Sequence, residues 1–370
     1  MRLLLLTIDF PPARGGVQSL LARLADGLAG ASVVTVVTGA TAGDRQWDAT
    51  QAFRVIRTWP LRWERLAVAA LSVRALLEVL KQRPHVIVCG HVLLGPLCRT
   101  IRAVFGVPYV AMAYAYEIRA PRMRSIAGVA LRGATRVVTI SEFSRRAVEA
   151  HGVSSSAITV IHPGAVVTGG PTPPLRPTRR GLRVVLSVGR LVDAYKGHDM
   201  VIRAMPLILA KAPDTEYVVV GDGPLRPYLE RLAASLGVAP SVRFVGQAGD
   251  DEVDAWYHAC DVFVLASRES DVSGGAEGYG IVFVEANLRG KPVVGGRSGG
   301  IPDAVIDGET GLLVDASDPA DIAEAVTRLL TEPGLAERLG RGGRRRAIED
   351  LSWPEYTERF RRVLSEAAAG

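Results

Sequence analysis

The feature that most constrains the fold of this chain is the alternation of short, fully apolar segments with longer amphipathic ones. In the first half, the apolar runs LLLLTI (3–8), SVVTVVT (32–38) and HVIVCG (85–90) are separated by stretches such as SLLARLADGLAG (19–30). Strands that are apolar along their whole length are buried on both faces, and their alternation with helices produces a parallel sheet covered by helices. The sequence therefore predicts an α/β fold.

This alternation occurs twice, with a break between the two sets. Residues 164–181, GAVVTGGPTPPLRPTRRG, contain four prolines and are typical of a linker. After the break come six further apolar runs, RVVLSVG, EYVVVGDG, VRFVGQ, DVFVLAS, KPVVGG and GLLVD. A chain of 370 residues is long enough for two cores. We expect one α/β domain over 1–165, a linker over 166–180, a second α/β domain over 181–352 and a final helix over 353–370.

The charge is distributed unevenly between the two halves. Residues 1–170 hold 20 Lys and Arg against 9 Asp and Glu, a net charge of +11, whereas residues 171–370 have a net charge of −5. This asymmetry favours an anionic partner for the first half, although arginine-rich surface usage would also explain it. Residues 57–83 combine basic and aromatic residues with leucines, which suits either a helix on a membrane surface or a core helix with a solvated basic face. The residues concerned are Arg57, Arg62, Arg65, Arg74, Lys81 and Arg83, with Trp59 and Trp63.

Cysteine usage and hydropathy indicate a cytoplasmic protein without a membrane span. The three cysteines, Cys89, Cys98 and Cys260, are too scattered for a disulfide framework or a zinc cluster, and we expect buried free thiols. The apolar run at the N-terminus ends at Asp9, so we read it as a first strand and not as a signal peptide. The uncharged stretch 103–116 is too short to cross a bilayer.

Glycines follow the first predicted strand and precede a helix. Gly15 and Gly16 would let the backbone approach a ligand closely, with the free N–H groups of the helix directed at an anion, but a plain strand-to-helix turn is the alternative. The turn does not match the G-x-G-x-x-G pattern of dinucleotide-binding proteins. Gly221 and Gly223 come nearer to it, but Arg226 occupies the third glycine position, which argues against a nicotinamide cofactor.

Two cations follow the first strand of the second half. Arg190 stands directly after Gly189 in VLSVGRLVDAYKG, and Lys196 precedes Gly197 and a predicted helix. Ligands of parallel sheets bind beyond the carboxyl ends of the strands, so the cleft between the two domains is the expected site. Arg binds two phosphate oxygens at once and Lys supplies a mobile charge, so the pair suits a diphosphate. A solvated loop with two basic residues is the alternative.

Two glutamates bracket the apolar run in EGYGIVFVEANLRG. Because Gly278 and Gly280 disfavour a continuous helix, we predict a glycine loop after Glu277 and then a helix from about Ile281 to Arg289, closed by Gly290. Glu285 would then lie one turn into the helix, where it could accept hydrogen bonds from a ribose diol. The packing face of this helix is predicted to consist of Ile281, Val284 and Leu288.

Several motifs, taken in order along the chain, resemble the retaining glycosyltransferases of family 4, which have the GT-B fold. They are PPARGGVQ (11–18), ISEFSRRAVEAHGVSSSAITVIHPGA (140–165), GRLVDAYKG (189–197), the two glutamates with seven residues between them, and SGGIPDAVIDGETGLLVD (298–315). The resemblance covers almost the whole chain. It implies two Rossmann-like domains that face each other across a cleft, with the helix from Trp353 packing back on the N-terminal domain.

The resemblance also implies a role for each matching residue. Arg190 and Lys196 would hold the donor diphosphate, Glu285 the nucleotide ribose, and Glu277 the transferred sugar or its leaving group. Catalysis would then depend on Arg190, Lys196 and Glu277. The other donor-binding positions would be Gly15, Gly16, Gly278, Tyr279 and Gly280.

One departure from the family concerns the first domain. Many relatives have a histidine near the reacting sugar, in a segment that reads MAYAYEIRAPRM (112–123) here and contains none. Tyr114 and Tyr116 are the candidates for that position and for acceptor binding. His91 and His162 lie elsewhere and are expected to be structural.

The function that this resemblance implies is retaining transfer of a hexosyl group from a nucleotide-diphosphate sugar to an acceptor hydroxyl. GDP-mannose is slightly favoured, because DVSGGAEGYG (271–280) resembles the loop of some mannosyltransferases, including those that act on phosphatidylinositol; UDP-glucose or UDP-N-acetylglucosamine follow. The chain has no Asp-x-Asp, so neither a metal nor another cofactor is expected. The acceptor would be anionic or lipid-linked, with peripheral contact to the inner membrane face, and nucleic acid is not an expected partner. The alternatives are a GT-B phosphorylase, a sugar-nucleotide epimerase and a non-catalytic sugar-nucleotide-binding module.

Overall fold

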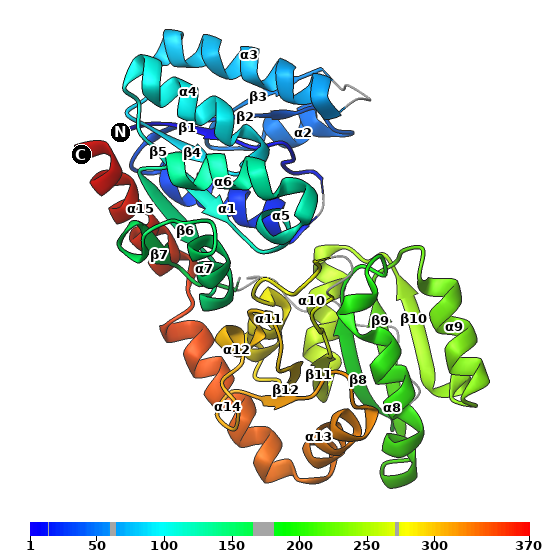
Figure 1. Ribbon diagram of the computed structural model, residues 1–370. Coiled ribbons are helices and arrows are strands. Elements are labelled where there is room, and N and C mark those ends of the chain that lie inside the picture. The colour runs from blue at the N-terminus through cyan, green and yellow to red at the C-terminus, as the bar shows by residue number, and fades with distance from the viewer. Residues whose placement is uncertain (14, 60–63, 166–180, 271–273) are drawn as a thin grey trace. The chain divides into compact units, whose positions relative to one another are not determined.

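The computed structural model describes residues 1–13, 15–59, 64–165, 181–270 and 274–370 (Figure 1). These residues form two compact units, the first made of 1–163 with 353–370 and the second of 164–352. The predicted linker, residues 166–180, lies outside the described residues, as do Arg62, Trp63 and the side chain of Arg65.

A parallel sheet forms the centre of the first unit. Its described strands have the order β3-β2-β1-β4-β5-β6-β7. They are β1 (Arg2–Leu6), β2 (Val33–Gly39), β3 (Arg54–Thr58), β4 (Val86–Cys89), β5 (Tyr109–Ala113), β6 (Arg136–Thr139) and β7 (Ile158–Val160). The strands β3 and β7 lie at the two edges and lack a continuous apolar run, because an edge strand is less completely covered than a central one.

Helices cover both faces of this sheet, and the last helix of the chain belongs to the same unit. They are α1 (Gly16–Ala29), α2 (Asp44–Asp48), α3 (Glu64–Gln82), α4 (Gly95–Phe105), α5 (Tyr116–Arg119), α6 (Arg124–Gly133), α7 (Glu142–Glu149) and α15 (Trp353–Ala369), with short 3₁₀ turns at 92–94, 121–123 and 155–157. The helix α15 packs on α1 and β5 through the buried residues Tyr356, Phe360 and Leu364. Its Arg359 donates a hydrogen bond to the Val160 carbonyl at 2.9 Å. The prediction that the final helix returns to the N-terminal domain is confirmed.

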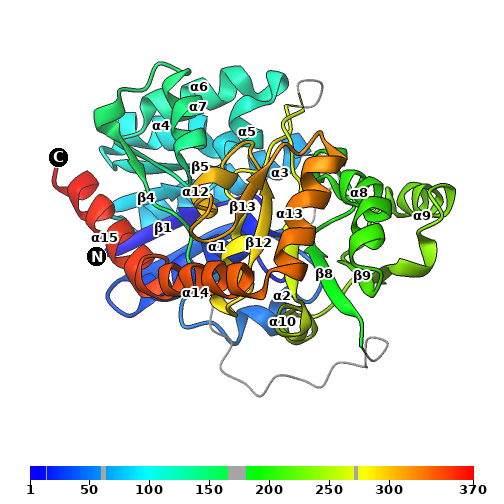
Figure 2. The ribbon, with the colours of Figure 1, turned by 90° about the horizontal axis from the view of Figure 1, so that it is seen from below.

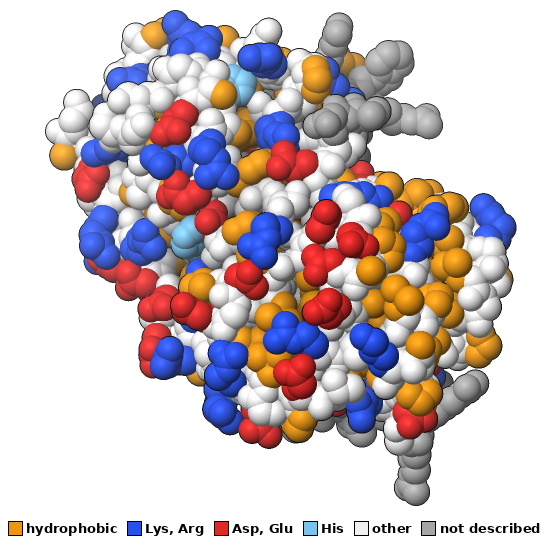
Figure 3. All heavy atoms as spheres, turned by 60° about the horizontal axis from the view of Figure 1, so that its bottom comes forward, with side chains coloured by type: hydrophobic (Ala, Val, Ile, Leu, Met, Phe, Trp, Pro, Cys, Tyr) orange, Lys and Arg blue, Asp and Glu red, His pale blue; other side chains and the backbone are white. Residues whose placement is uncertain are grey.

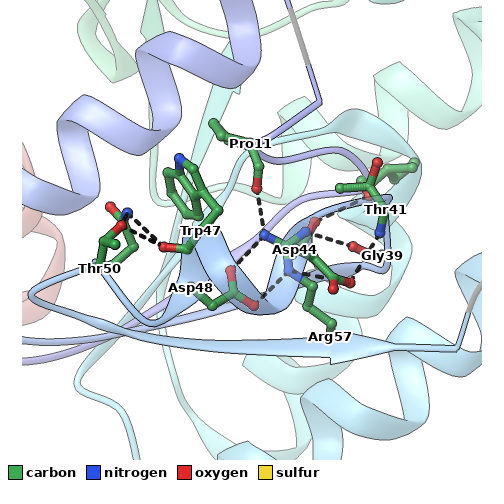
Figure 4. A network of polar contacts seen from close by, with 11 residues as sticks. Pro11, Gly39, Thr41, Asp44, Trp47, Asp48, Thr50 and Arg57 are labelled. Atoms are coloured by element: carbon green, nitrogen blue, oxygen red, sulfur yellow. Dashed lines mark hydrogen bonds and ion pairs between the residues drawn. The ribbon is translucent and has the colours of Figure 1, made fainter.

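Arg57 corrects the prediction of a basic surface segment over 57–83. It lies in β3, not on a helix, and only 8% of its side chain is exposed. Its guanidinium pairs with Asp48 at 2.7 Å and donates to the carbonyl oxygens of Gly39 and Pro11 (Figure 4). Arg57 therefore anchors α2 and the loop before it and is not available to a membrane surface.

The second unit is built on another parallel sheet, in which the described strands have the order β10-β9-β8-β11-β12-β13. They are β8 (Arg183–Val188), β9 (Thr215–Val220), β10 (Val242–Gly246), β11 (Val262–Leu265), β12 (Val293–Gly296) and β13 (Leu312–Val314). Each corresponds to one of the six apolar runs predicted after the break, so this part of the fold prediction is confirmed.

The helices of the second unit lie on both faces of its sheet. They are α8 (His198–Lys211), α9 (Arg226–Ser235), α10 (Asp250–Ala259), α11 (Ile281–Leu288), α12 (Ile301–Ala304), α13 (Pro319–Thr331) and α14 (Pro333–Glu349), with 3₁₀ turns at 194–196 and 239–241. The helices α8 and α13 pack side by side on one face (Figures 1 and 2). On the other face, α11 packs against α14.

The predicted packing face of α11 was wrong at one position. Ile281 is only half-buried, and Phe283 is fully buried instead. The ring of Phe283 packs edge-on against Phe263 of β11, with 5.4 Å between the ring centroids. Phe283 therefore takes the packing position in the first turn of α11 that Ile281 was predicted to hold.

The sequence also led us to expect buried cysteines, no membrane span and an excess of basic residues. Cys89, Cys98 and Cys260 are all free and buried, as predicted. No helix within the described ranges is long and apolar enough to cross a membrane. On the face drawn in Figure 3, basic and acidic side chains are interspersed, so the basic excess does not form a single-sign patch there.

Candidate functional site

The candidate site of the second unit begins where β8 ends. Gly189 and Arg190 follow this strand, and Lys196 closes a 3₁₀ turn directly before α8. Gly197 has a φ of 76°, and a Cβ at this position would come within 1.8 Å of the Ala266 carbonyl oxygen. Only glycine fits so close to another backbone, and this approach fixes Lys196 beside the end of β11.

Lys196 and Glu277, which were predicted to act on the donor, meet in the structure. The Lys196 ammonium donates to Glu277 Oε2 at 2.5 Å, and the two side chains are 17% and 16% exposed. Burial by itself would lower the pKa of Lys196, but the facing Glu277 carboxylate outweighs it, so the pKa is raised. Lys196 therefore keeps its positive charge at neutral pH.

Arg190 adds a second positive charge to the same region. Its side chain is exposed, and its charge acts on Lys196 in the direction that lowers the pKa of the ammonium. Two like charges this close repel each other, and an anion between them would relieve the repulsion. The arrangement is suited to binding a diphosphate.

The loop that carries Glu277 is held by backbone contacts. The Glu277 carbonyl accepts a hydrogen bond from Gly300 N–H at 2.9 Å. Gly280, with a φ of 91°, caps α11. The side chain of Tyr279 is buried, and burial raises its pKa. Contacts of Gly278, Tyr279 and Gly280 with a sugar nucleotide would therefore be made by their backbone atoms.

Glu285 lies on α11, as predicted, and has a partner that sequence reasoning missed. The Tyr257 hydroxyl, on α10, donates to Glu285 Oε2 at 2.8 Å. Arg289, the C-cap residue of α11, donates to the Glu285 carbonyl at 3.1 Å. Nothing in the sequence around Tyr257 marked it, because its relation to Glu285 arises only when α10 and α11 pack together.

His198 is a second residue that sequence reasoning missed. It opens α8 and is only 3% exposed, with Nδ1 3.3 Å from the Tyr217 hydroxyl. That hydroxyl is 2.9 Å from Ser187 Oγ, and Ser187 donates to the Val264 carbonyl. Since a carbonyl only accepts, Ser187 must accept from Tyr217, and Tyr217 must then accept from Nδ1–H of His198. Burial and the Lys196 charge lower the pKa of His198 to about 3, so this histidine is neutral.

In the first unit, the glycines after β1 lie at the start of α1. Gly15 is the N-cap residue, and the helix begins at Gly16. A Cβ on Gly15 would meet only the flexible Gln18 side chain, whereas one on Gly16 would meet nothing within 4 Å. The space around Gly16 is therefore open.

The two tyrosines predicted to bind the acceptor differ in exposure. Tyr114 is buried, and its hydroxyl donates to the Gly90 carbonyl at 3.2 Å. Tyr116 is 44% exposed, and its hydroxyl lies 3.3 Å from Arg122 Nη2. The neighbouring Glu117 carboxylate accepts a 2.6 Å hydrogen bond from Tyr114 N–H, and burial raises its pKa. Tyr116 is thus the more accessible of the two tyrosines.

His91 and His162 were expected to be structural, and no metal site was expected. His91 accepts from Leu93 N–H at 3.2 Å, and His162 Nδ1 lies 3.2 Å from the Ile140 carbonyl, contacts that suit the structural roles expected of them. Across the part of the chain that the structure describes, no group of three or more His, Cys, Asp or Glu residues could hold a metal ion.

Comparison with known families matches both halves of the chain. Residues 15–164 match the glycosyl transferase 4-like domain, and residues 176–346 match the glycosyl transferases group 1 family.

Curated relatives match over nearly the whole length. A GDP-mannose-dependent alpha-(1-6)-phosphatidylinositol monomannoside mannosyltransferase of Mycolicibacterium smegmatis is 35% identical, over 98% of this chain and 98% of the relative. A GDP-mannose-dependent monoacylated alpha-(1-6)-phosphatidylinositol monomannoside mannosyltransferase of Corynebacterium glutamicum is 28% identical, over 98% and 97%.

Solved structures share the fold at lower identity. Anabaena HepE in complex with UDP-glucose superposes with a TM-score of 0.80 at 20% identity, covering 99% of this chain and 100% of HepE. A sucrose-phosphate synthase of Thermosynechococcus elongatus gives 0.81 at 22% identity, covering 100% of this chain and 99% of the synthase.

Proposed function

We propose that this chain, which belongs to the glycosyl transferases group 1 family and is a glycosyltransferase of the family 4 type with the GT-B fold, transfers a mannosyl group from GDP-mannose to a lipid-linked acceptor hydroxyl. The choice of donor and acceptor is supported by the relative from Mycolicibacterium smegmatis, which is named for GDP-mannose and for a phosphatidylinositol mannoside. Mannose was first suggested by the loop DVSGGAEGYG (271–280), of which residues 271–273 lie outside the described residues.

The observation that supports this function most strongly is the grouping of Lys196 and Glu277 beside Arg190 after β8. Arg190 and Lys196 would bind the diphosphate of the donor, and Glu277 would hold the mannosyl group or the phosphate that leaves it. Phosphate oxygens and the Glu277 carboxylate would compete for the same ammonium, so donor binding would redirect the 2.5 Å contact of Lys196. Glu285 would accept hydrogen bonds from the ribose.

In the proposed reaction no protein side chain forms a bond to the sugar. The bond between the sugar C1 and the phosphate oxygen breaks, the acceptor oxygen bonds to C1 from the same face, and its proton passes to the departing phosphate. Negative charge develops on that phosphate in the transition state, where fixed cations stabilise it. Removal of such a cation typically costs roughly 3–4 kcal/mol of activation free energy, about a hundred- to a thousand-fold in rate.

We propose that no metal ion takes part. The cations Arg190 and Lys196 would supply the charge that a divalent ion supplies in enzymes with an Asp-x-Asp motif. Activity should therefore persist in excess EDTA. Loss of activity that Mg²⁺ or Mn²⁺ restores would show this proposal to be wrong.

The first unit would bind the acceptor. Gly15 and Gly16, at the start of α1, would border the donor phosphates, and Tyr114 and Tyr116 would lie on the acceptor side. Of the two, Tyr116 has the exposed hydroxyl and is the better candidate for direct contact. A lipid-linked acceptor requires the enzyme to work at a membrane surface, and an exposed apolar stripe on α3, formed by Leu66, Val73, Leu77 and Leu80, supports peripheral contact.

Two measurements test the proposed donor and acceptor. A thermal-shift panel of GDP-mannose, UDP-glucose, UDP-N-acetylglucosamine and dTDP-glucose should give the largest rise in Tm with GDP-mannose, because a ligand that binds only the folded state stabilises it. Transfer from GDP-mannose to phosphatidylinositol mannosides is then followed by mass spectrometry. A larger shift with a UDP-sugar would overturn the donor assignment, and transfer from a sugar phosphate without a nucleotide would indicate a phosphorylase.

A further inference from the structure

The hydrogen bond between Tyr257 and Glu285 connects α10 to α11. Tyr257 lies on α10 and is 2% exposed, and its hydroxyl donates to Glu285 Oε2 of α11 at 2.8 Å. Burial, and then the adjacent Glu285 carboxylate, raise the pKa of Tyr257 well above its ordinary value. The phenol therefore stays protonated and can only donate to this carboxylate.

The ring of Tyr257 is fixed on several sides. It packs against Phe263 of β11 with 5.7 Å between centroids, and the Arg289 guanidinium lies 5.7 Å from its centre. Arg289 is fixed in turn by an ion pair with Asp254, which also lies on α10, with 2.7 Å between Nε and Oδ1. Both partners of this pair are more than nine-tenths buried. The hydroxyl of Tyr257 is thus held in one place by the packing of α10 against α11.

From these contacts we infer that Tyr257 is a positioning residue, which orients the Glu285 carboxylate for the nucleotide ribose. A glutamate side chain loses conformational entropy when it is fixed, and a partner that fixes it beforehand spares the ligand that cost. A carboxylate has about four acceptor positions, so the hydrogen bond from Tyr257 leaves capacity for a ribose diol. This inference rests on the proposed function, in which Glu285 binds the ribose.

The test compares two nucleotides that differ only at the ribose. Binding of GDP and of 2′,3′-dideoxy-GDP is measured by calorimetry for the wild-type protein and for Tyr257→Phe, which keeps the ring and removes the hydroxyl. A hydrogen bond to a charged group is lost, so we expect the Kd for GDP to rise roughly 5- to 20-fold. The Kd for the dideoxy nucleotide should stay the same, because it has no hydroxyl for Glu285 to bind. A purely structural role would weaken both nucleotides equally.

A matched control and a double variant complete the experiment. Tyr109→Phe removes the hydroxyl of another buried tyrosine, which donates to the Ala130 carbonyl in the first unit, and should leave both Kd values unchanged. In a Glu285→Ala background, Tyr257→Phe should have no further effect on GDP binding. An undiminished preference for GDP in Tyr257→Phe would overturn the inference alone. Equal binding of the two nucleotides by the wild-type protein would instead overturn the ribose assignment of Glu285.

Discussion

At the scale of single residues, the candidate site depends on contacts between positions far apart in the sequence. Lys196 and Glu277 are separated by 81 positions and meet at 2.5 Å. The carboxylate keeps the partly buried ammonium charged, and the nearby Arg190 makes the region favourable for an anion. The charges are therefore arranged before a ligand arrives, which is the condition for electrostatic stabilisation of a leaving group.

Removing either cation should slow transfer strongly and leave the fold intact. Lys196→Ala and Arg190→Ala are each expected to lower kcat about a hundred- to a thousand-fold, because each removes charge from the leaving phosphate. Turnover at saturating donor and Tm are the measurements. Lys211→Ala, at the exposed opposite end of α8, is the control and should keep full activity. Wild-type turnover in either cation variant would remove that residue from the proposed mechanism.

His198 should make the protein less stable as the pH falls below about 6.5. Its folded pKa is lowered to about 3, so between these values the unfolded chain binds a proton that the folded chain does not. Stability therefore rises with pH across this window, and going from pH 7.5 to pH 5.5 should cost about 1.4 kcal/mol from this group.

The substitution His198→Asn tests this expectation. The asparagine amide does not titrate and can still donate to the Tyr217 hydroxyl. The difference in the free energy of unfolding between pH 7.5 and pH 5.5, measured in urea, should shrink by about 1.4 kcal/mol. An unchanged pH dependence would mean that His198 is not the group responsible.

At the scale of secondary-structure elements, short connections determine where the site residues lie. Gly197 joins the turn of Lys196 to α8 with a positive φ, and Gly280 does the same between the loop of Glu277 and α11. The helix α8 therefore starts two residues after Lys196, and α11 starts four residues after Glu277. Both positions have a positive φ, which favours glycine, and the backbone there determines where the Lys196 and Glu277 side chains lie.

Gly197→Ala should destabilise the second unit and displace Lys196. The left-handed backbone costs a non-glycine residue roughly 1–2 kcal/mol, and here the new Cβ would also overlap the Ala266 carbonyl oxygen. We expect a loss of more than about 2 kcal/mol in urea unfolding. Gly237→Ala is the matched control, since Gly237 has a similar φ of 71° with nothing within 4 Å of the added Cβ. If the two variants lost the same stability, the contact with Ala266 would not be the cause.

At the scale of the whole molecule, the question is which surface meets the acceptor. The prediction of a basic surface segment over 57–83 is corrected by the burial of Arg57, but α3 within that segment carries exposed apolar side chains. They are Leu66, Val73, Leu77 and Leu80, each more than half exposed, and their spacing of seven, four and three residues places them on one helical face. Arg74 and Lys81 lie on the same helix.

The protein should sediment with anionic vesicles and not with zwitterionic ones, and less so at high salt. Apolar side chains on α3 would enter the interface, and nearby cations would each contribute about 1 kcal/mol on anionic lipid. Leu77→Gln with Leu80→Gln should abolish binding, whereas Leu207→Gln, an exposed leucine in the second unit, should not. Equal sedimentation with both lipid types, or none, would argue for a water-soluble acceptor.

The sequence by itself determined the two sheets and the chemical types of the site residues. Apolar runs predict central strands because such strands are buried on both faces, and for that reason the six strands described in the second unit could be predicted directly. The edge strand β3 escaped because its alternating sequence, RVIRT, also fits a solvated segment. The cations stood out through their place after a predicted strand, and the two glutamates through the likeness of the surrounding motifs to a family.

Only the tertiary structure decided which of these residues meet. Whether Lys196 faces Glu277, whether Arg57 is solvated or buried, and whether Tyr257 reaches Glu285 each depend on how two elements pack. Local sequence carries no record of such contacts, because the partner is supplied by another segment and the burial of both is a property of the assembled unit. His198 depends on the assembled unit in the same way, because its lowered pKa comes first from burial in the core around it and only then from the charge of Lys196, two residues earlier.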